Sequence, residues 1–270
     1  MISLAALTTL CLAFLGTQAL PTNSTLERRA ATVYTKCTTP NTVAITFDDG
    51  PYSYTYDIVN ALDAAGAKGT FFVNGNNWGC IYDQANVDRV KYAYNHGHQL
   101  ASHTWAHKDL NTLTWDQIHD EMWRVEQALV RITGAYPAFM RPREYPVLDS
   151  TPLTADLEIA YGNYNSMVLD ASGIRGQGVV IWDLDSGDST GASVQSSKNT
   201  YSSRISAHPS TILALNHETI ETTAHQVLPY AIQQLKAAGY RLVTVAECLG
   251  KPAYQSVVAP SPRDVRVSLT

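Results

Sequence analysis

The sequence predicts an α/β fold built around a mostly parallel sheet or barrel. Short apolar runs, which are typical of buried strands, alternate along the chain with longer stretches whose apolar residues recur at helical spacing. No internal repeat or low-complexity tract interrupts this alternation. We predict strands over residues 42–47, 69–74, 99–102, 179–184, 211–216 and 241–245.

Two helices between these strands have clear boundaries. In the first, Thr114 and Gln117 can form a capping box and Gly134 marks the end. The second covers residues 223–238, and Gly239 ends it. Each helix has one apolar stripe, formed by Ile118, Met122, Val125, Leu129 and Ile132 in the first and by Val227, Leu228, Ala231, Ile232 and Leu235 in the second.

The composition is that of a folded and mildly acidic protein. Of the 270 residues, 45% are hydrophobic and 16% are charged, and the net charge is -5. The chain can therefore bury a sizeable core, but it offers no basic face for phosphates. We expect a monomer with one domain over residues 30–250, and we exclude nucleic acid as a partner.

The two ends of the chain are expected to lie outside this domain. The apolar run over residues 2–15 is too short to span a bilayer but suits a signal peptide over residues 1–19, which predicts secretion. The dibasic pair Arg28-Arg29 makes residues 20–29 a possible pro-segment, and an uncleaved linker is the alternative. Residues 251–270 have no helical period and are predicted as an exposed tail of coil.

Cysteine usage predicts one disulfide. Cys11 leaves with the signal peptide, so three cysteines remain in an oxidising compartment. Cys37 and Cys248 stand at the two ends of the domain, where a bridge restricts the unfolded chain most. We therefore pair these two and expect Cys80 to be a buried free thiol.

Ionisable residues follow four of the predicted strands. The carboxyl ends of parallel strands meet at one edge of a sheet or barrel, where ligands bind. An Asp-Gly-Pro turn or a His-x-x-x-His spacing alone is more often structural. Four such strand ends together indicate a functional site, and the residues are Asp48 and Asp49, then His103 and His107, then Asp183, Asp185 and Asp188, and finally His217.

These residue types suit metal-assisted hydrolysis. His103 and His107 can face one way across a helical turn, and one carboxylate completes a set of three ligands with open positions for water and substrate. Two imidazoles and a carboxylate suit zinc, although cobalt or nickel fits the same ligands. Asp48 and Asp49 can share the site only where the strand breaks, and Gly50-Pro51 supplies that break. One aspartate can then act as base, while His217 protonates the leaving group.

Four motifs resemble those of polysaccharide deacetylases of the nodulation-protein-B type, which are carbohydrate esterases, and most closely those of secreted fungal chitin deacetylases. They are Thr46-Phe47-Asp48-Asp49-Gly50-Pro51, Ser102-His103-Thr104-Trp105-Ala106-His107, residues 180–188 and Leu215-Asn216-His217. The resemblance implies a distorted (β/α) barrel that removes acetyl groups from N-acetylglucosamine units. It further implies Asp48 as base, Asp49, His103 and His107 as ligands of a divalent metal, His217 as acid, and Leu215 in the acetyl pocket.

The third motif of that family, Arg-Pro-Pro-Tyr-Gly, is interrupted in this sequence. Arg141-Pro142 begins it, and its ending reappears as Tyr161-Gly162. We interpret residues 143–159 as an insertion or an unspliced intron. The intron is suggested because codons for Arg143-Glu144-Tyr145 and Ile159-Ala160 can contain splice signals, and excision between these signals would join the flanking nucleotides into a codon for the missing proline. Asp188 is the expected partner of Arg141, and Asp185 is the second candidate. The backbone N–H of Tyr161 is expected to donate a hydrogen bond to the oxyanion.

The predicted function is the deacetylation of chitin or chitin oligomers in the extracellular space or cell wall. The set of Asp48, Asp49, His103, His107 and His217 favours an enzyme, because a binding module needs neither a base nor an acid. The interrupted third motif favours a catalytically impaired carbohydrate-binding relative. An acetylxylan esterase is the alternative among enzymes, because the same attack by water serves an ester.

Overall fold

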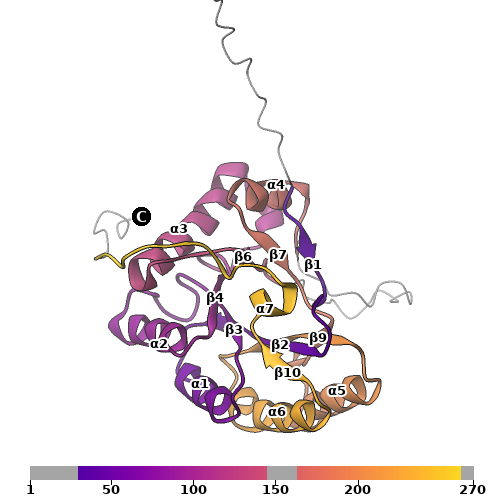
Figure 1. Ribbon diagram of the computed structural model, residues 1–270. Helices are drawn as coiled ribbons and strands as arrows, with labels where there is room; N and C mark the ends of the chain where they lie inside the picture. Colours follow the sequence, from indigo (N-terminus) through magenta and orange to yellow (C-terminus); the bar gives the residue numbers. More distant parts are fainter. Residues whose placement is uncertain (1–29, 145–162, 263–270) are drawn as a thin grey trace, which may run out of the picture.

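The computed structural model describes residues 30–144 and 163–262. Its main sheet has the strand order β1-β7-β6-β4-β3-β2-β9-β8, and every pairing in it is parallel (Figure 1). β10 also pairs with β2, at its start. The strands are β1 (Val33–Tyr34), β2 (Thr42–Gly50), β3 (Thr70–Val73), β4 (Gln99–Ser102), β6 (Phe139–Met140), β7 (Gly178–Val180), β8 (Leu184–Asp185), β9 (Thr211–His217) and β10 (Arg241–Val243).

The sheet curls into a barrel that the chain itself closes. β7 lies near one edge of the sheet and β8 lies at the other, yet only three residues separate them in the sequence. Ile181 donates its backbone N–H to Tyr34 on β1, whereas Asp183 donates to Leu213 on β9. The predicted strand over 179–184 is therefore two strands, because its middle residues cross from one edge to the other. The predicted distorted (β/α) barrel is confirmed.

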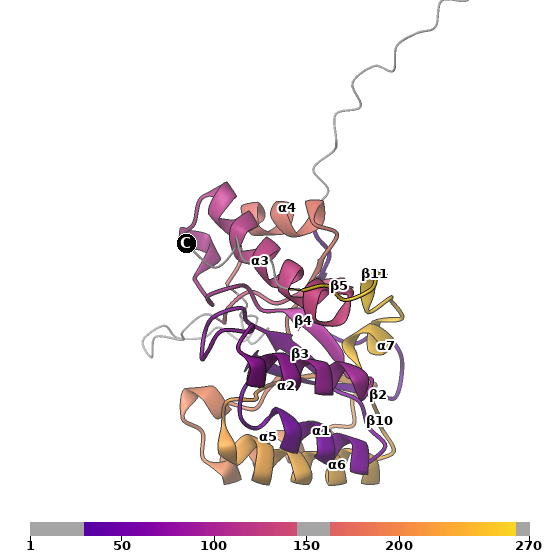
Figure 2. The same cartoon turned by 90° about the vertical axis from the view of Figure 1, so that its left-hand side faces the viewer.

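Helices surround the barrel on two sides. Figures 1 and 2 show α1, α5 and α6 together on one side and α3 and α4 on the opposite side. No helix among the residues 30–144 and 163–262 is long and apolar enough to cross a membrane. The helices are α1 (Thr55–Ala64), α2 (Gln84–Asn95), α3 (Trp115–Thr133), α4 (Ser166–Ile174), α5 (Val194–Ser206), α6 (Leu228–Ala237) and α7 (Val245–Leu249).

The two predicted helices are present, with one difference. Thr114 and Gln117 form the expected capping box of α3, and Gly134 ends it with φ +82°. The second predicted helix begins as a π-helical turn over Thr223–Val227 and becomes α6 only at Leu228. Helical periodicity thus located both helices, but it did not distinguish the π-helical turn before α6 from an ordinary α-helical turn.

The interior of the barrel changes from apolar to polar along the strands. Side chains two apart on a strand share a face, and buried Ala44, Phe72 and Leu213 lie in one apolar cluster with residues of α7. Further along the same strands stand Thr46 and Asp48 on β2 and His217 on β9. The carboxyl end of the barrel is therefore its polar end, where the sequence analysis placed a site.

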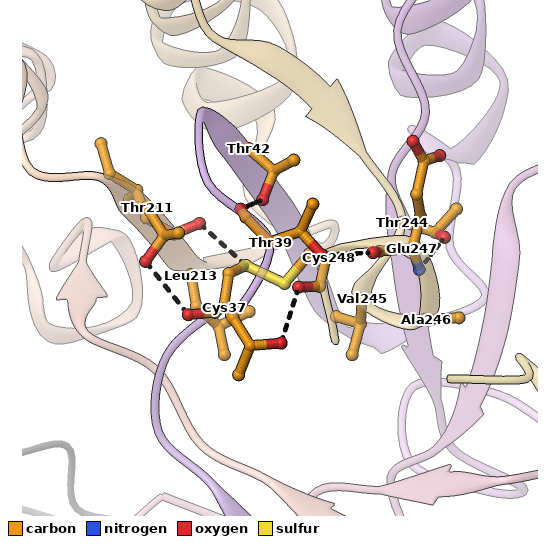
Figure 3. The surroundings of a disulfide bond; sticks show 12 residues. Cys37, Thr39, Thr42, Thr211, Leu213, Thr244, Val245, Ala246, Glu247 and Cys248 are labelled. Atoms are coloured by element: carbon orange, nitrogen blue, oxygen red, sulfur yellow. Dashed lines mark hydrogen bonds between the residues drawn. A yellow bond between two sulfur atoms is a disulfide. The ribbon is translucent and has the colours of Figure 1, made fainter. Parts of the chain in front are cut away.

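The predicted disulfide between Cys37 and Cys248 is confirmed. It joins the segment before β2 to α7, with the two Cα atoms 5.1 Å apart (Figure 3). Thr38 and Thr39 donate their backbone N–H groups to the carbonyl of Cys248, so the bridge is reinforced locally. Cys80 is a free thiol as expected, but it is half-buried rather than buried.

The C-terminal segment differs from the predicted coil. Tyr254–Val257 forms β11, which pairs antiparallel with β5 (Ala135–Pro137) in a second small sheet. Val258 then donates its backbone N–H to the Gly134 carbonyl, and a Cβ on Gly134 would stand 1.9 Å from the Val258 carbonyl oxygen. Residues 251–262 are mostly exposed, so the prediction of an exposed tail holds for them while that of coil is wrong.

Candidate active site

A bulge at the end of β2 brings two neighbouring carboxylates into one site. The register of β2 against β3 shifts between Asp48 and Gly50, and Asp49 has a left-handed backbone with φ +73°. The strand therefore continues to Gly50 and does not break, which corrects the expected mechanism. Gly50 is required because a Cβ there would lie 2.0 Å from the Glu218 carboxyl carbon.

The two histidines converge from a loop, so the expected helical turn is wrong. His103 follows β4 directly, and the chain bends through positive φ at Thr104 (70°) and His107 (53°). Trp105 between them is 7% exposed and packs so closely on Gly75 that a Cβ there would meet its ring at 1.9 Å. His103 Nδ1 lies 2.9 Å from the Arg141 carbonyl oxygen, and donation to it turns Nε2 toward Asp49.

Asp49, His103 and His107 form a candidate metal centre. One donor atom from each lies within 4.8 Å of the others. The Nε2 atoms of His103 and His107 are buried and have no hydrogen-bond partner among the described residues. Burial and the neighbouring His107 lower the pKa of His103 well below its usual range, so this imidazole is neutral, the form that binds metals. Buried polar nitrogens without a hydrogen-bond partner are costly, and a divalent ion bound to both Nε2 atoms would offset this cost.

Asp48 is suited to accept a proton. Its Oδ1 accepts a hydrogen bond of 2.6 Å from the Arg141 guanidinium, whereas its buried Oδ2 has no hydrogen-bond partner among the described residues. Oδ2 lies 3.5 Å from His103 Nε2, beside the metal centre. Burial raises the pKa of Asp48 to about 7, although the Arg141 charge opposes this. A carboxylate with that pKa can act as a general base near neutral pH.

Arg141 does not pair with Asp188, which corrects the sequence prediction. Its fully buried guanidinium donates to Thr46 Oγ1 at 2.7 Å, to Asp48, and to the carbonyl oxygens of Val180 and Ile181, each at 3.0 Å. Val180 and Ile181 lie where the chain leaves one edge of the sheet. Arg141 therefore donates to these two carbonyls through Nε and Nη2, and its Nη1 donates to Thr46 and to Asp48.

Asp188 instead holds His217. Its Oδ1 lies 2.7 Å from His217 Nδ1, and its Oδ2 accepts from the His217 backbone N–H at 2.8 Å and from Thr223 Oγ1 at 2.7 Å. Burial alone lowers the pKa of His217, but the hydrogen bond and the charge of Asp188 raise it to about 10. The register between β8 and β9, in which Asp185 opposes Leu215, places Asp188 beside His217. Asp188 thus favours the imidazolium form of His217, whose buried Nε2 has no hydrogen-bond partner among the described residues.

The remaining predicted site residues are Leu215, Asp183, Asp185 and Tyr161. Leu215 is buried on β9 in an apolar cluster that includes Trp182. Asp183 and Asp185 are not members of the metal centre. Asp183 pairs with Arg204, and Asp185 accepts from the Gly187 backbone. Tyr161 and most of the segment 143–159 lie outside the described residues, as do the predicted signal peptide and pro-segment.

The sequence analysis missed Glu144, which directly precedes the undescribed segment. Its Oε2 lies 3.6 Å from His107 Nε2, and its Oε1 lies 3.8 Å from His217 Nε2. Its side chain is 25% exposed. Nothing in the sequence around Glu144 indicates a ligand, because the residue belongs to no motif and lies on no predicted element.

A buried base, a cluster of metal donors and an imidazolium at the open end of a distorted (β/α) barrel define a hydrolase. A family model described as polysaccharide deacetylase matches residues 35–164. A chitin deacetylase of Pestalotiopsis sp is 36% identical over 225 residues, which cover 81% of this chain and 67% of that protein. The chain belongs to the polysaccharide deacetylase family.

A second relative is similar in both sequence and structure. A chitin deacetylase of Colletotrichum lindemuthianum is 34% identical over 230 residues, which cover 84% of this chain and 88% of that protein. The solved structure of the chitin deacetylase from this fungal pathogen has a TM-score of 0.74 at 30% identity, over 86% of this chain and 98% of that one. The fold and the enzyme class therefore agree with those expected from the motifs.

Proposed function

We propose that this protein removes N-acetyl groups from N-acetylglucosamine residues of chitin or chitin oligomers and releases acetate. One observation carries the proposal: a base, a set of three metal donors and a protonated imidazole lie together at one end of the barrel. The names of two relatives, both called chitin deacetylase, support chitin as the substrate.

The metal centre would hold one divalent ion through Asp49, His103 and His107. Such an ion supplies a Lewis acid that polarises the acetyl carbonyl and lowers the pKa of the attacking water. Two imidazoles and one carboxylate suit zinc best, and cobalt or nickel fits the same set.

Two side chains move the protons. Asp48 Oδ2, which lacks a hydrogen-bond donor, accepts the proton of the attacking water, while Arg141 holds Oδ1 in place. His217 Nε2 then donates a proton to the leaving amine, because Asp188 keeps this imidazole charged. Leu215 would contact the acetyl methyl group, and the backbone N–H of Tyr161 would hold the oxyanion.

The compartment and the state of assembly are part of the same proposal. The disulfide between Cys37 and Cys248 is consistent with an oxidising compartment, so we place the protein outside the cell or in the cell wall. We expect a monomer, because a single chain supplies all the groups named above.

Acetate release from two substrates tests this function. Chitin oligomers and acetylated xylan would each be incubated with the purified protein, with a chelator, and with zinc added back after chelation. We expect zinc-dependent release from chitin oligomers and less from xylan. Preferential release from xylan would make the protein an esterase of the same family, and release that a chelator leaves unchanged would refute the metal-dependent mechanism.

A further inference from the structure

Glu144 brings a further carboxylate to the site. Asp48 and Asp49 enter from β2, whereas Glu144 follows β6 and faces His107 with one oxygen and His217 with the other. Its Oε2 is buried without a hydrogen-bond partner among the described residues, as are the Nε2 atoms of both histidines. The separations of 3.6 and 3.8 Å are too long for direct hydrogen bonds.

The separation between Glu144 and His107 is close to that of two atoms that share a metal ion. Two ligands each about 2.0–2.1 Å from a tetrahedral ion lie about 3.3–3.4 Å apart. Glu144 Oε2 lies 3.6 Å from His107 Nε2, which equals the distance from Asp49 Oδ1 to the same atom. Glu144 is not one of the three residues whose donors all lie within 4.8 Å of one another. Its oxygens therefore do not lie within 4.8 Å of all three donors, and Glu144 stands beside His107 at the edge of the metal centre.

The backbone holds Glu144 in this position. The Arg141 N–H donates to the Ser102 carbonyl at 2.8 Å, and the Arg143 carbonyl accepts from the Asn163 N–H at 2.9 Å. Asn163 is itself buried and accepts a side-chain hydrogen bond from Asn111. The residues leading to Glu144 are thus fixed to two separate parts of the barrel end.

A carboxylate at this place has the chemistry of the reaction product. Acetate also presents two oxygens, one toward the metal centre and one toward the acid. The charges agree: Arg141, His217 and a divalent ion are balanced by the four carboxylates Asp48, Asp49, Asp188 and Glu144. Without Glu144 one positive charge remains, which the oxyanion of the transition state would neutralise.

We propose that Glu144 is an internal competitor for the acetyl position, standing beside His107 at the edge of the metal centre and facing His217 in place of substrate. This inference rests on the proposed function. A catalytic zinc site keeps one position open for water and substrate, and a carboxylate beside the site competes for that position. The chain as written should therefore turn over slowly.

Zinc affinity tests the inference without relying on turnover. Glu144→Gln and Glu144→Ala would be compared with the unmodified chain by competition against a chromophoric chelator. Glu247→Gln is the matched control. Glu247 lies on α7, away from the site, and forms an exposed ion pair with Arg241. We expect both Glu144 variants to bind zinc about 10- to 100-fold more weakly, and the control to bind it as the unmodified chain does.

Acetate binding is the second readout. In the cobalt-loaded protein, added sodium acetate should leave the visible spectrum of the unmodified chain unchanged and should alter that of Glu144→Ala. Unchanged zinc affinity together with equal responses to acetate in all variants would overturn the inference, even if the chain is an active deacetylase. Weaker zinc binding in a Glu144 variant that releases no acetate would support the inference and count against the proposed function.

Discussion

Replacing Asp188 by asparagine should abolish the charged state of His217 near neutral pH. The substitution keeps the shape and the capacity for hydrogen bonding to the His217 backbone and Thr223, but it removes the negative charge 2.7 Å from Nδ1. His217 has a pKa of about 10 with the carboxylate present. Burial alone lowers that pKa, so we expect the variant to titrate at or below about 6.5, the ordinary value for histidine.

The size of the effect follows from this difference. A fall from about 10 to about 6.5 corresponds to about 5 kcal/mol of lost stabilisation of the imidazolium, at roughly 1.36 kcal/mol for each pKa unit. At pH 8 only about 3% of His217 would then be protonated. Because only about 3% of the molecules then carry the general acid, we expect acetate release to fall about 30-fold at pH 8 and by less at pH 6.

NMR titration of the histidines in the zinc-free protein measures this directly. Asp185→Asn is the control, because Asp185 lies in the same turn and accepts a hydrogen bond from Gly187 rather than from His217. A His217 pKa that stays near 10 in Asp188→Asn would refute the assignment of Asp188 as its partner. Equal shifts in Asp188→Asn and Asp185→Asn would show that the general field of the site, and not the pair, sets the charge.

Three further predictions concern the acid, the inserted segment and a buried carboxyl. His217→Ala should slow amide cleavage more than cleavage of an activated ester, because a good leaving group needs no proton; equal losses on both substrates would contradict the acid role. Replacing residues 143–160 by one proline, which writes Arg-Pro-Pro-Tyr-Gly, should raise acetate release above that of the unmodified chain, and lower release would show that the segment belongs to the working site. Burial raises the pKa of Glu218 to about 7, so its ionisation destabilises the folded state as pH rises from about 4.5 to 7. Glu218→Gln should gain about 3 kcal/mol relative to the unmodified chain between pH 4 and pH 8 in urea unfolding, and a constant difference would contradict this pKa.

The strands that were predictable from the sequence are those whose residues are almost all buried and therefore largely apolar. The runs that became β2, β3, β4 and β9 are buried along nearly their whole length, so their apolar character is visible in the sequence. β1 and β6 have only two residues each, and β5 and β11 form a separate small sheet. Such short strands carry no measurable period, because the pairing with neighbours alone makes them strands.

The sequence predicted which residues form the site, but it did not predict which of them form hydrogen-bonded pairs. Residues at the carboxyl ends of parallel strands must meet, which is why Asp48, Asp49, His103 and His217 lie together. Which groups face each other depends on the closure of the barrel, and that closure directs Arg141 to Asp48 and leaves Asp188 to His217.

Backbone conformation and charge explain the remaining differences. The spacing of His103 and His107 fits a helical turn as well as a loop, and only the left-handed backbones at Thr104 and His107 decide for the loop. Glu144 carries no sequence signal, because its place in the site comes from the backbone hydrogen bonds of Arg141 to Ser102 and of Asn163 to Arg143.

The central claim is that two adjacent aspartates do different work, with Asp49 holding the metal and Asp48 taking the proton. Zinc binding and acetate release, measured in Asp48→Asn and Asp49→Asn, test it most directly, in the unmodified chain and in the Glu144→Gln background. We predict that Asp48→Asn binds one equivalent of zinc while releasing acetate about 10²- to 10⁴-fold more slowly, and that Asp49→Asn binds zinc weakly. Loss of zinc from both variants alike, or full acetate release by Asp48→Asn, would contradict the account.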